Sequence, residues 1–488
     1  MKDENKNQEE IGYVTSVSNY LVWINGLPNV KVSEIVLSES GGRGLVNSIN
    51  EDLVEVMMLD EVKIQPSERF KRTFSTLKIT AGKHLLSRVI NPLGQSIDGK
   101  GGFSKSGDVV DIEHIPLGIN SRASIIQQFE TGLTLIDMLV PIALGQRELV
   151  IGDGHSGKTG FILDTIINQK NKNILCIYAV IGKPIVQIRN IYEVLRVNKA
   201  LNYTVMVASS SSESASLIYL NPLVATTLAE YFQRQGNDVL LILDDLGLHA
   251  KYYREISLLS DRAPGRDAYP GDIFYQHARL LERAGKFNKK FGGGSITALP
   301  VIETASDDYS SYITTNLMGM TDGHLLFSSN RYRQGFRPSV DIYLSVSRVG
   351  RQTQHLAQKA LADRIKALLA RANKLQSYSR LGTEVSAETL NVLKQARQTE
   401  TILKQEPLIK VPLIIQMILL GLIYTPFFNQ RDYLFVEVNK NRIVDYLIKS
   451  TYLNQFLTTM SKIKDDKEFI NAVSVFIPDL EKVCQVQK

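Results

Sequence analysis

The segment GDGHSGKT at residues 152–159 has the residue types and spacing of a phosphate-binding loop. Its glycines let consecutive backbone N–H groups turn inward around phosphate oxygens. Lys158 supplies a cation for the β- and γ-phosphates, and the Thr159 hydroxyl can hold Mg²⁺. We therefore predict that the chain binds a nucleoside triphosphate with Mg²⁺. The residues predicted to contact the nucleotide are Gly152, Asp153, Gly154, His155, Ser156, Gly157, Lys158 and Thr159.

Two carboxylates, Asp244 and Asp245, end the apolar run DVLLILDD at 238–245. The run predicts a buried strand, and a carboxylate at the C-terminal end of such a strand is expected beside a phosphate loop. There it can hold the water shell of Mg²⁺. We predict that Asp244 and Thr159 bind the metal. The alternative is a charged turn that ends the strand.

Hydrolysis also requires a group that orients or activates the attacking water. In ring-shaped ATPases this group is usually a glutamate that follows the strand after the phosphate-loop helix. Here that strand is NILCIYAVI (173–181), the residue at the expected position is Lys183, and the next acid is Glu193. A protonated lysine cannot act as a base. We therefore predict a site that binds nucleotide without turning it over.

Arg348 ends the apolar segment DIYLSVSR and precedes Val349 and Gly350. A fixed guanidinium at the end of a strand can stabilise the charge that develops on a neighbouring subunit's γ-phosphate. The spacing alone leaves open an ordinary solvated arginine. The arginines that compete for the role are Arg331, Arg333, Arg337 and Arg351.

The elements that must position these residues follow one pattern from about 146 to 350. Short apolar runs alternate with segments of helical spacing, which predicts a parallel α/β nucleotide-binding core. RELVI (147–151) is the strand expected before the loop, and FILDTIINQ (161–169) is the helix after it. The other predicted strands are 173–181, 203–211, 238–246, 295–304, 324–329 and 341–347, and the other predicted helices are 223–235 and 273–287.

The pattern divides the chain into three predicted domains. Residues 11–80 alternate apolar and polar side chains in short runs, which indicates an N-terminal β-barrel. Residues 81–351 form the nucleotide-binding domain. Residues 352–488 lose the strand pattern and form a C-terminal α-helical domain, with helical spacing at 352–375, 386–405 and 444–463.

Composition narrows the class of protein. The chain has 488 residues and a net charge of +6, which gives no indication of nucleic-acid binding at this length. Cys176 and Cys484 lie in unlike contexts and indicate a reducing compartment. The polar N-terminus is no signal peptide. The apolar segment 411–428 contains Gln416 and prolines, and we expect a buried helix there rather than a membrane span.

Several longer strings resemble the α subunit of the F-type ATP synthase head. The resemblance covers roughly residues 11–405. The strings are GQRELVIGDGHSGKT (145–159), DTIINQK (164–170), CIYAVIG (176–182), DDLGLHAKYYREISLL (244–259), RAPGRDAYPGDIFYQHARLLERAGK (262–286), GGGSITALPVIET (292–304), TDGHLLF (321–327) and SVSRVG (345–350).

The resemblance implies a β-barrel, a RecA-like nucleotide-binding domain and a helical domain. It implies a ring in which α subunits alternate with catalytic β subunits around a central γ-type shaft, at the cytoplasmic side of the cell membrane or in a cytoplasmic complex. The α site holds Mg-ATP without turnover in a proton-translocating synthase. Arg348 would then be the arginine that reaches into the neighbouring catalytic site.

The sequence departs from the family at several positions. Gly154, His155 and Ser156 stand where the family usually has Arg-Gln-Thr, and Lys183 replaces a glutamine. The N-terminal stalk-docking helix is shortened, the turn TEVSAET (383–389) carries less charge, and the last eighty residues match poorly. These departures indicate a divergent α-type subunit, which leaves open a specialised F-like ATPase that drives another process, such as gliding.

Two other interpretations remain. A Rho-like RNA translocase or a secretion ATPase would need a glutamate base, which is absent at Lys183, and an RNA motor would also need a basic, aromatic-rich surface. A purely structural subunit that has lost its nucleotide is disfavoured by the intact Gly157-Lys158-Thr159.

Overall fold

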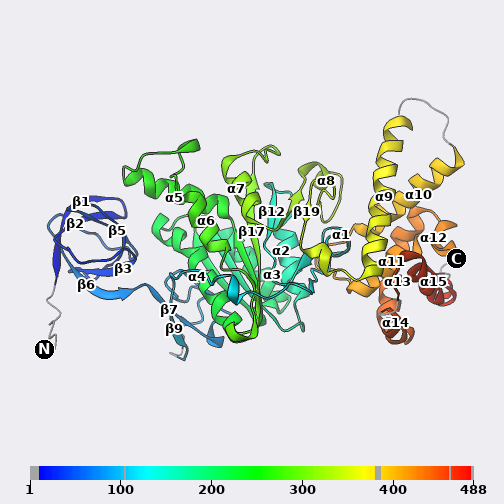
Figure 1. The fold of residues 1–488 in the computed structure, drawn as a ribbon, viewed down its shortest axis with the longest axis horizontal. Helices are drawn as coiled ribbons and strands as arrows, with labels where there is room; N and C mark the ends of the chain where they lie inside the picture. The colour runs from blue at the N-terminus through cyan, green and yellow to red at the C-terminus, as the bar shows by residue number, and fades with distance from the viewer. Residues whose placement is uncertain (1–9, 104–105, 380–385, 461–462, 485–488) are drawn as a thin grey trace. The chain divides into compact units, whose positions relative to one another are not determined.

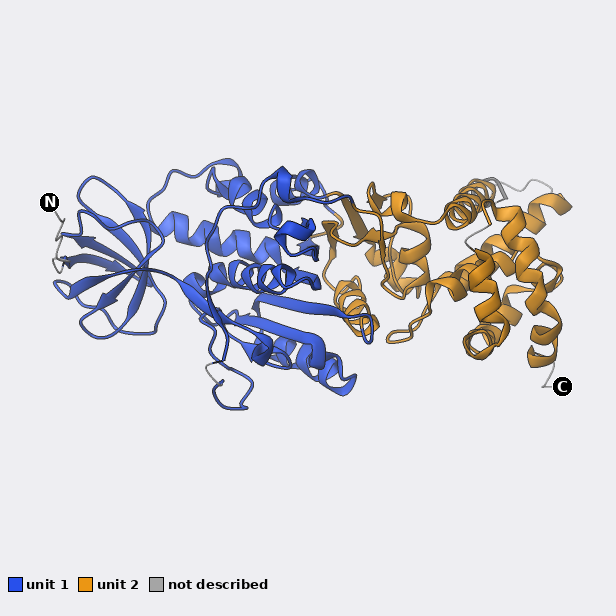
Figure 2. Cartoon of the chain, turned by 60° about the horizontal axis from the view of Figure 1, so that its bottom comes forward, with its two compact units in different colours: residues 1–124, 170–304, 308–321 blue, residues 125–169, 305–307, 322–488 orange. Residues whose placement is uncertain are grey.

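A computed structural model of the chain describes residues 10–103, 106–379, 386–460 and 463–484 (Figure 1). Most of the polar N-terminal segment and the first part of the turn predicted at 383–389 lie outside the described residues. The chain divides into two compact units, which are described separately (Figure 2). Unit 1 consists of residues 1–124, 170–304 and 308–321. Unit 2 consists of residues 125–169, 305–307 and 322–488.

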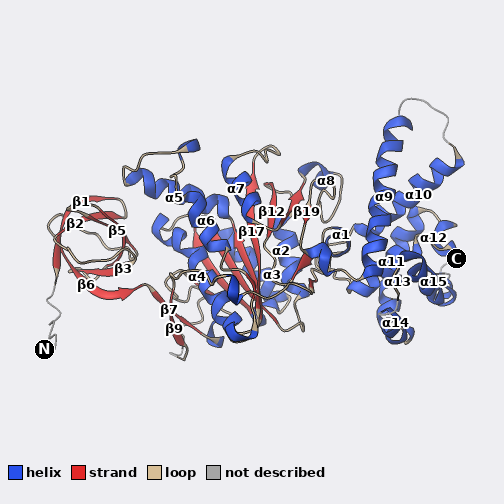
Figure 3. Ribbon diagram, viewed as in Figure 1, coloured by secondary structure: helices blue, strands red, loops and turns tan. Residues whose placement is uncertain are grey.

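Unit 1 contains the predicted β-barrel, a closed antiparallel barrel with strand order β1-β2-β5-β4-β3-β6 (Figure 3). Alternate side chains point inward, so that Val22, Val36, Val56 and Phe70 are completely buried. The strands are β1 (Ile11–Ser18), β2 (Leu21–Asn25), β3 (Glu34–Ser38), β4 (Arg43–Ile49), β5 (Val54–Met58) and β6 (Arg69–Thr76).

The remainder of unit 1 is built on five parallel strands in the order β17-β15-β13-β14-β8. The central strands are continuous apolar runs buried on both faces, as the α/β prediction requires. The strands are β8 (Val89–Ile90), β13 (Ile174–Lys183), β14 (Thr204–Ser210), β15 (Asp238–Asp244) and β17 (Ser295–Thr304), with β16 (Gly285–Lys286) antiparallel to β17 and a separate pair, β7 (Lys78–Ala81) and β9 (Asp108–Asp111).

Helices pack against this sheet and against the barrel. Leu21, Leu45 and Met57 of the barrel share one buried cluster with Leu220 and Ile256 of the helices. The barrel and the sheet therefore belong to one packed body within unit 1. The helices are α3 (Ile185–Val197), α4 (Ala215–Arg234), α5 (Leu246–Leu259), α6 (Ile273–Leu281) and α7 (Tyr312–Met320).

Unit 2 contains the phosphate loop and the C-terminal helices. Its strand β12 (Glu148–Asp153) pairs in parallel with β18 (Gly323–Phe327), and β19 (Val346–Ser347) pairs antiparallel with β18. The strand predicted at 341–347 is wrong except for these last two residues. Asp341 accepts hydrogen bonds from the backbone N–H groups of Tyr343 and Leu344, which folds the segment into a turn. The smaller elements are β10 (Gln128–Phe129), α1 (Thr134–Leu139), β11 (Ile142–Ala143), α2 (Lys158–Asn168) and α8 (Ser329–Arg333).

The C-terminal part is helical, as predicted. The apolar segment 411–428 forms two short helices, the first of which is buried. Among the described residues, no helix is long and apolar enough to span a bilayer. The segment 444–463, predicted as continuous, breaks at Ser450 into two helices. The helices are α9 (Leu356–Ser379), α10 (Ala387–Leu403), α11 (Leu413–Leu422), α12 (Pro426–Asn429), α13 (Tyr433–Lys449), α14 (Tyr452–Met460), α15 (Asp466–Val473) and α16 (Ile477–Cys484).

A buried ion pair in unit 1 provides a test of this packing. The Arg283 guanidinium donates to both carboxylate oxygens of Glu230, at 3.0 and 2.7 Å, and both side chains are buried. Burial alone would raise the pKa of Glu230, but hydrogen bonds from His114 and Arg283 outweigh it and lower the pKa to about 2. The charged carboxylate therefore stabilises the fold above its unfolded pKa, and this contribution disappears as the pH falls to about 2.

We expect Glu230→Gln to lower the free energy of unfolding by about 3–5 kcal/mol at pH 7, because Arg283 would remain buried without a counter-charge. Urea denaturation at a series of pH values measures this difference. The difference in the free energy of unfolding between wild type and variant should become smaller as the pH falls from about 4.5 towards 2. An equal difference in the free energy of unfolding at pH 7 and near pH 2 would show that the charged Glu230 carboxylate does not stabilise the fold.

Candidate nucleotide-binding site

The phosphate loop lies between β12 and α2 of unit 2, in the strand–loop–helix arrangement predicted for it. Gly157 ends the loop in a left-handed conformation, φ +97°, which favours glycine, and it is the N-cap residue of α2. A side chain at Gly152 has no room, because its Cβ would lie 2.5 Å from the carbonyl oxygen of Phe327. These two glycines hold the loop against its neighbours and leave the start of α2 uncovered by side chains of its own.

Hydrogen bonds within the loop fix its shape. The Lys158 ammonium is buried and donates to the carbonyl oxygens of Gly152 and Asp153, both at 2.6 Å. Ser156 is buried, and its hydroxyl donates to the carbonyl oxygen of Asp153 at 2.7 Å. The Ser339 hydroxyl donates to the Ser156 carbonyl. Ser156, one of the residues that depart from the family, therefore stabilises the loop through hydrogen bonds to Asp153 and Ser339.

The first turn of α2 has the properties of an anion site. No side chain caps this helix, and its first turn carries no acidic residue. Its N–H groups and dipole therefore favour a phosphate. Thr159 is exposed in this turn, where its hydroxyl can reach a metal ion. Phe161 anchors the buried face of α2 against Phe327, with ring centroids 5.4 Å apart.

Tyr332 lies beside this loop in unit 2, and Arg337 and Gln405 follow it in a chain of contacts that the sequence did not indicate. A Cβ on Gly157 would lie 3.2 Å from the ring of Tyr332, and the guanidinium carbon of Arg337 lies 3.3 Å from the centroid of that ring. The Gln405 backbone N–H donates to the Arg337 carbonyl at 2.7 Å. A hollow of about 620 Å³ is lined in part by Arg337 and Gln405. An aromatic ring and an arginine beside a phosphate loop can stack on a base.

Asp244, the predicted metal residue, lies in unit 1 at the end of β15. The neighbouring parallel strand β13 ends at Lys183. The Lys183 ammonium lies 2.6 Å from Oδ1 of Asp244, and the Tyr178 hydroxyl donates to Oδ2 at 2.8 Å. The side chains of Asp244 and Lys183 are 2% and 15% exposed. The residue that replaces the expected acid is thus the ion-pair partner of the predicted metal ligand.

Asp245 has a different role from its neighbour. Its carboxylate is the N-cap of α5 and accepts hydrogen bonds from the backbone N–H groups of Gly247 and Leu248. It also accepts from the N–H of Glu303 at 2.8 Å. Burial is the largest cause that raises the pKa of Asp245 to about 6, followed by the charge of Asp244. Asp245 therefore caps the helix that follows Asp244.

A hydroxyl such as that of Thr159 and a carboxylate such as that of Asp244 are compatible with Mg²⁺. Within the described ranges, no three or more histidine, cysteine or acidic side chains gather as a metal cluster. Mg²⁺ commonly binds through one carboxylate, waters and substrate phosphates rather than in such a protein cage. Thr159 and Asp244 supply a hydroxyl and a carboxylate of this kind, although the carboxylate already has a cationic partner in Lys183.

Arg348 follows β19 in unit 2 and is exposed. Among the residues that the structure describes, it has no hydrogen-bond or ion-pair partner. Of its competitors, Arg351 pairs with Asp363 and Arg337 donates to the carbonyl oxygens of Tyr332 and Phe336. The guanidinium of Arg331 lies over the ring of Phe336, whereas that of Arg333 is exposed.

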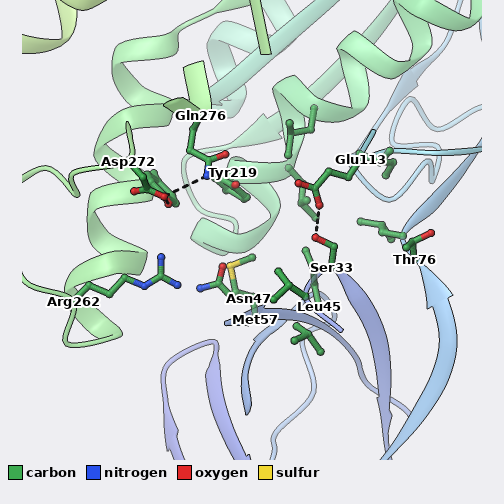
Figure 4. Close-up of a pocket in the computed structure, with 17 residues that line it drawn as sticks. Ser33, Leu45, Asn47, Met57, Thr76, Glu113, Tyr219, Arg262, Asp272 and Gln276 are labelled. Atoms are coloured by element: carbon green, nitrogen blue, oxygen red, sulfur yellow. Dashed lines mark hydrogen bonds between the residues drawn. The ribbon is translucent and has the colours of Figure 1, made fainter. Parts of the chain in front are cut away.

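A separate cavity of about 160 Å³ lies between the barrel and the helices of unit 1 (Figure 4). The Tyr253 hydroxyl donates to the carboxylate of Asp272 at 2.6 Å on its helical side, and Ser33 of the barrel side donates to Glu113. None of the predicted site residues lines this cavity. It belongs to the packing of the barrel on the helices.

Comparisons with known proteins match two parts of the chain, the first of which carries the phosphate loop, Lys183 and Asp244. Residues 132–347 match the nucleotide-binding domain of the ATP synthase alpha/beta family. Residues 354–475 match the C-terminal domain of the ATP synthase alpha/beta chain.

Curated relatives extend the match over most of the chain. An ATP synthase subunit alpha of Caldanaerobacter subterraneus subsp. tengcongensis is 43% identical over 81% of this chain and 78% of the relative. The ATP synthase subunit alpha of Mycoplasma genitalium is 42% identical over 81% of this chain and 76% of the relative. That of Metamycoplasma arthritidis is 38% identical over 97% of this chain and 90% of the relative.

Proposed function

Because this chain belongs to the ATP synthase alpha/beta family and its relatives are alpha subunits, we propose that it is the non-catalytic α-type subunit of an F-type ATPase head. It binds ATP at residues 152–159 and retains it. The observation that supports this proposal is the ion pair between Lys183 and Asp244, because an ammonium that is held by a carboxylate cannot act as a base.

Each predicted residue has a role in this proposal. Lys158 and the N–H groups at the start of α2 bind the phosphates, while Thr159 and Asp244 hold Mg²⁺. The metal, when bound, neutralises phosphate charge. Stacking of Tyr332 on the base is part of this proposal, and the closeness of its ring to Gly157 supports it. The exposed Arg348 acts in trans and stabilises charge at the catalytic site of the adjacent β-type subunit.

The proposed assembly is a ring in which this chain alternates with a catalytic β-type subunit around a γ-type shaft. We propose that the ring works at the cytoplasmic face of the membrane, as a peripheral complex of a proton-translocating synthase or of a specialised F-like ATPase. The domains are proposed to be 11–80, 81–351 and 352–488.

Co-expression with a β-type subunit tests the assembly. Native mass spectrometry is expected to show a hexamer with equal numbers of the two chains, and ATPase activity that RNA does not stimulate. A homohexamer of this chain with RNA-stimulated hydrolysis would instead support a self-sufficient translocase.

A further inference from the structure

A buried glutamine of unit 2 joins the start of β12 to the segment that carries Arg348. Gln146 lies two residues before β12 and is completely buried. Its Nε2 donates to the hydroxyl oxygen of Ser347 at 3.3 Å and to the carboxyl group of Glu148. Ser347 is the last residue of β19, and Arg348 follows it directly. The contact is therefore one residue away from the arginine that is proposed to act in trans.

The backbone on both sides of Arg348 is seated on one carbonyl group. The Ser347 hydroxyl donates to the Pro141 carbonyl oxygen. Two residues after Arg348, a Cβ on Gly350 would lie 1.7 Å from the same oxygen, so that no side chain fits there. Ser347 also pairs with Gly323 of β18. The backbone of this segment is therefore closely held, whereas the Arg348 side chain is exposed.

Gln146 also holds the turn that presents this carbonyl group. Pro141 directly precedes β11, which ends at Ala143. The Ala143 backbone N–H donates to Oε1 of Gln146 at 2.8 Å, and the Gln146 N–H donates to the Ala143 carbonyl oxygen at 3.0 Å. Gln146 thus holds both partners of one hydrogen bond. It contacts the Ser347 hydroxyl directly, and it fixes the Pro141 carbonyl through the turn at 142–146.

The carboxamide of Gln146 lies in the interior, where polar atoms cost free energy unless they are hydrogen-bonded. Both its Nε2 and its Oε1 have partners, and such contacts specify one arrangement of the elements that they join. Burial, followed by the charge of Asp322, raises the pKa of Glu148 well above its usual range, which favours the neutral carboxyl. The contacts of Gln146 therefore fix geometry rather than balance charge.

We propose that Gln146 is a positioning residue for Arg348 and keeps its backbone where the guanidinium reaches the neighbouring catalytic site. The inference rests on the proposed function, in which Arg348 acts in trans. The guanidinium ends a long, exposed side chain, so its place depends on the backbone that carries it. A displacement of about 1 Å in a catalytic group can lower a rate by about 100-fold. Gln146 acts on the reaction through Ser347 and Pro141.

Steady-state ATPase assays of the complex reconstituted with a β-type subunit test the inference. Gln146→Ala is expected to lower kcat by about 10- to 100-fold and to leave the KM for ATP within about twofold of wild type, because the lost interaction acts in the transition state. Gln398→Ala is the matched control. It removes an equally buried glutamine of unit 2, whose Nε2 donates to the carbonyl oxygens of Phe428 and Arg431, both at 2.8 Å. The control complex should keep the kcat of wild type.

A double variant distinguishes positioning of Arg348 from a general structural effect. If Gln146 acts through Arg348, the complex with both alanines should be less than about twofold slower than the Arg348→Ala complex. Losses that multiply in the double variant would show that Gln146 acts by another route, and the inference would then be wrong. Ser347→Ala removes only the hydroxyl and should lower kcat by about tenfold. It decides the question if Gln146→Ala fails to fold, since a wild-type kcat would then contradict the inference.

The outcomes also separate the inference from the function on which it rests. A Gln146→Ala complex with the kcat of wild type, beside an inactive Arg348→Ala complex, would overturn the positioning role and leave the proposed function standing. A fully active Arg348→Ala complex would remove the trans role of Arg348 and the inference with it.

Discussion

Alanine in place of Arg348 is expected to lower ATP hydrolysis by the assembled ring by about 10³-fold or more, the range found when an arginine finger is removed. The transferred phosphoryl group develops charge that a fixed guanidinium stabilises without any covalent step. The side chain is exposed and has no ion-pair partner among the described residues, so its removal costs the fold little. Steady-state ATPase assays of the reconstituted complex measure the effect.

Arg333→Ala is the matched control for this experiment. Arg333 is also exposed, lies in the same unit and carries the same charge, but it belongs to α8 rather than to the segment after β19. The control complex should retain its activity, and ATP binding by the Arg348→Ala chain should equal that of wild type. A complex that remains active with alanine at 348 would show that another residue supplies the charge.

Lys158→Ala is expected to weaken ATP binding by this chain by about 10- to 150-fold, which corresponds to loss of one charged hydrogen bond of about 1.5–3 kcal/mol. The lysine is the first residue of α2, directly after Gly157, at the end of the helix where the backbone N–H groups favour a phosphate. Equilibrium binding of a fluorescent ATP analogue to the full-length chain measures the loss.

The same ammonium also ties two loop carbonyls together, so the variant needs a structural check. A thermal melt close to that of wild type would show that the loss reflects binding alone. Lys170→Ala, which removes an exposed lysine just beyond α2, should leave the affinity unchanged. Equal affinities for wild type and Lys158→Ala would mean that the loop does not hold the nucleotide.

Local sequence patterns predicted the architecture well where they were strong. The strands predicted at 173–181 and 238–246 are the buried parallel strands Ile174–Lys183 and Asp238–Asp244, and the alternating runs near the N-terminus form the closed barrel. The pattern failed at 341–347, where Asp341 binds two backbone N–H groups and makes a turn from an apolar segment. The local hydrogen bonds of the Asp341 side chain thus favoured a turn over the strand that the apolar spacing predicted.

The candidate site was predictable only where its residues are contiguous. The motif at 152–159 can be read directly from the sequence, but Tyr332 lies beside the loop only through the fold, and no local spacing indicates it. The pairing of Lys183 with Asp244 depends on which strands are neighbours and where each ends. The N-cap role of Asp245 had a local signal, an aspartate directly before a helical segment, which the metal hypothesis obscured.

The central claim is that this chain binds ATP without hydrolysing it, and the fate of ATP bound to the chain alone tests this claim most directly. Purified full-length chain in excess over radiolabelled ATP is incubated, quenched in acid and analysed for nucleotide and free phosphate. The account predicts that the bound nucleotide is recovered as intact ATP, because the residue where the sequence pattern predicts a base is Lys183, whose ammonium is paired with Asp244. Release of phosphate at the rate of a working ATPase, from the chain without its partners, would contradict it.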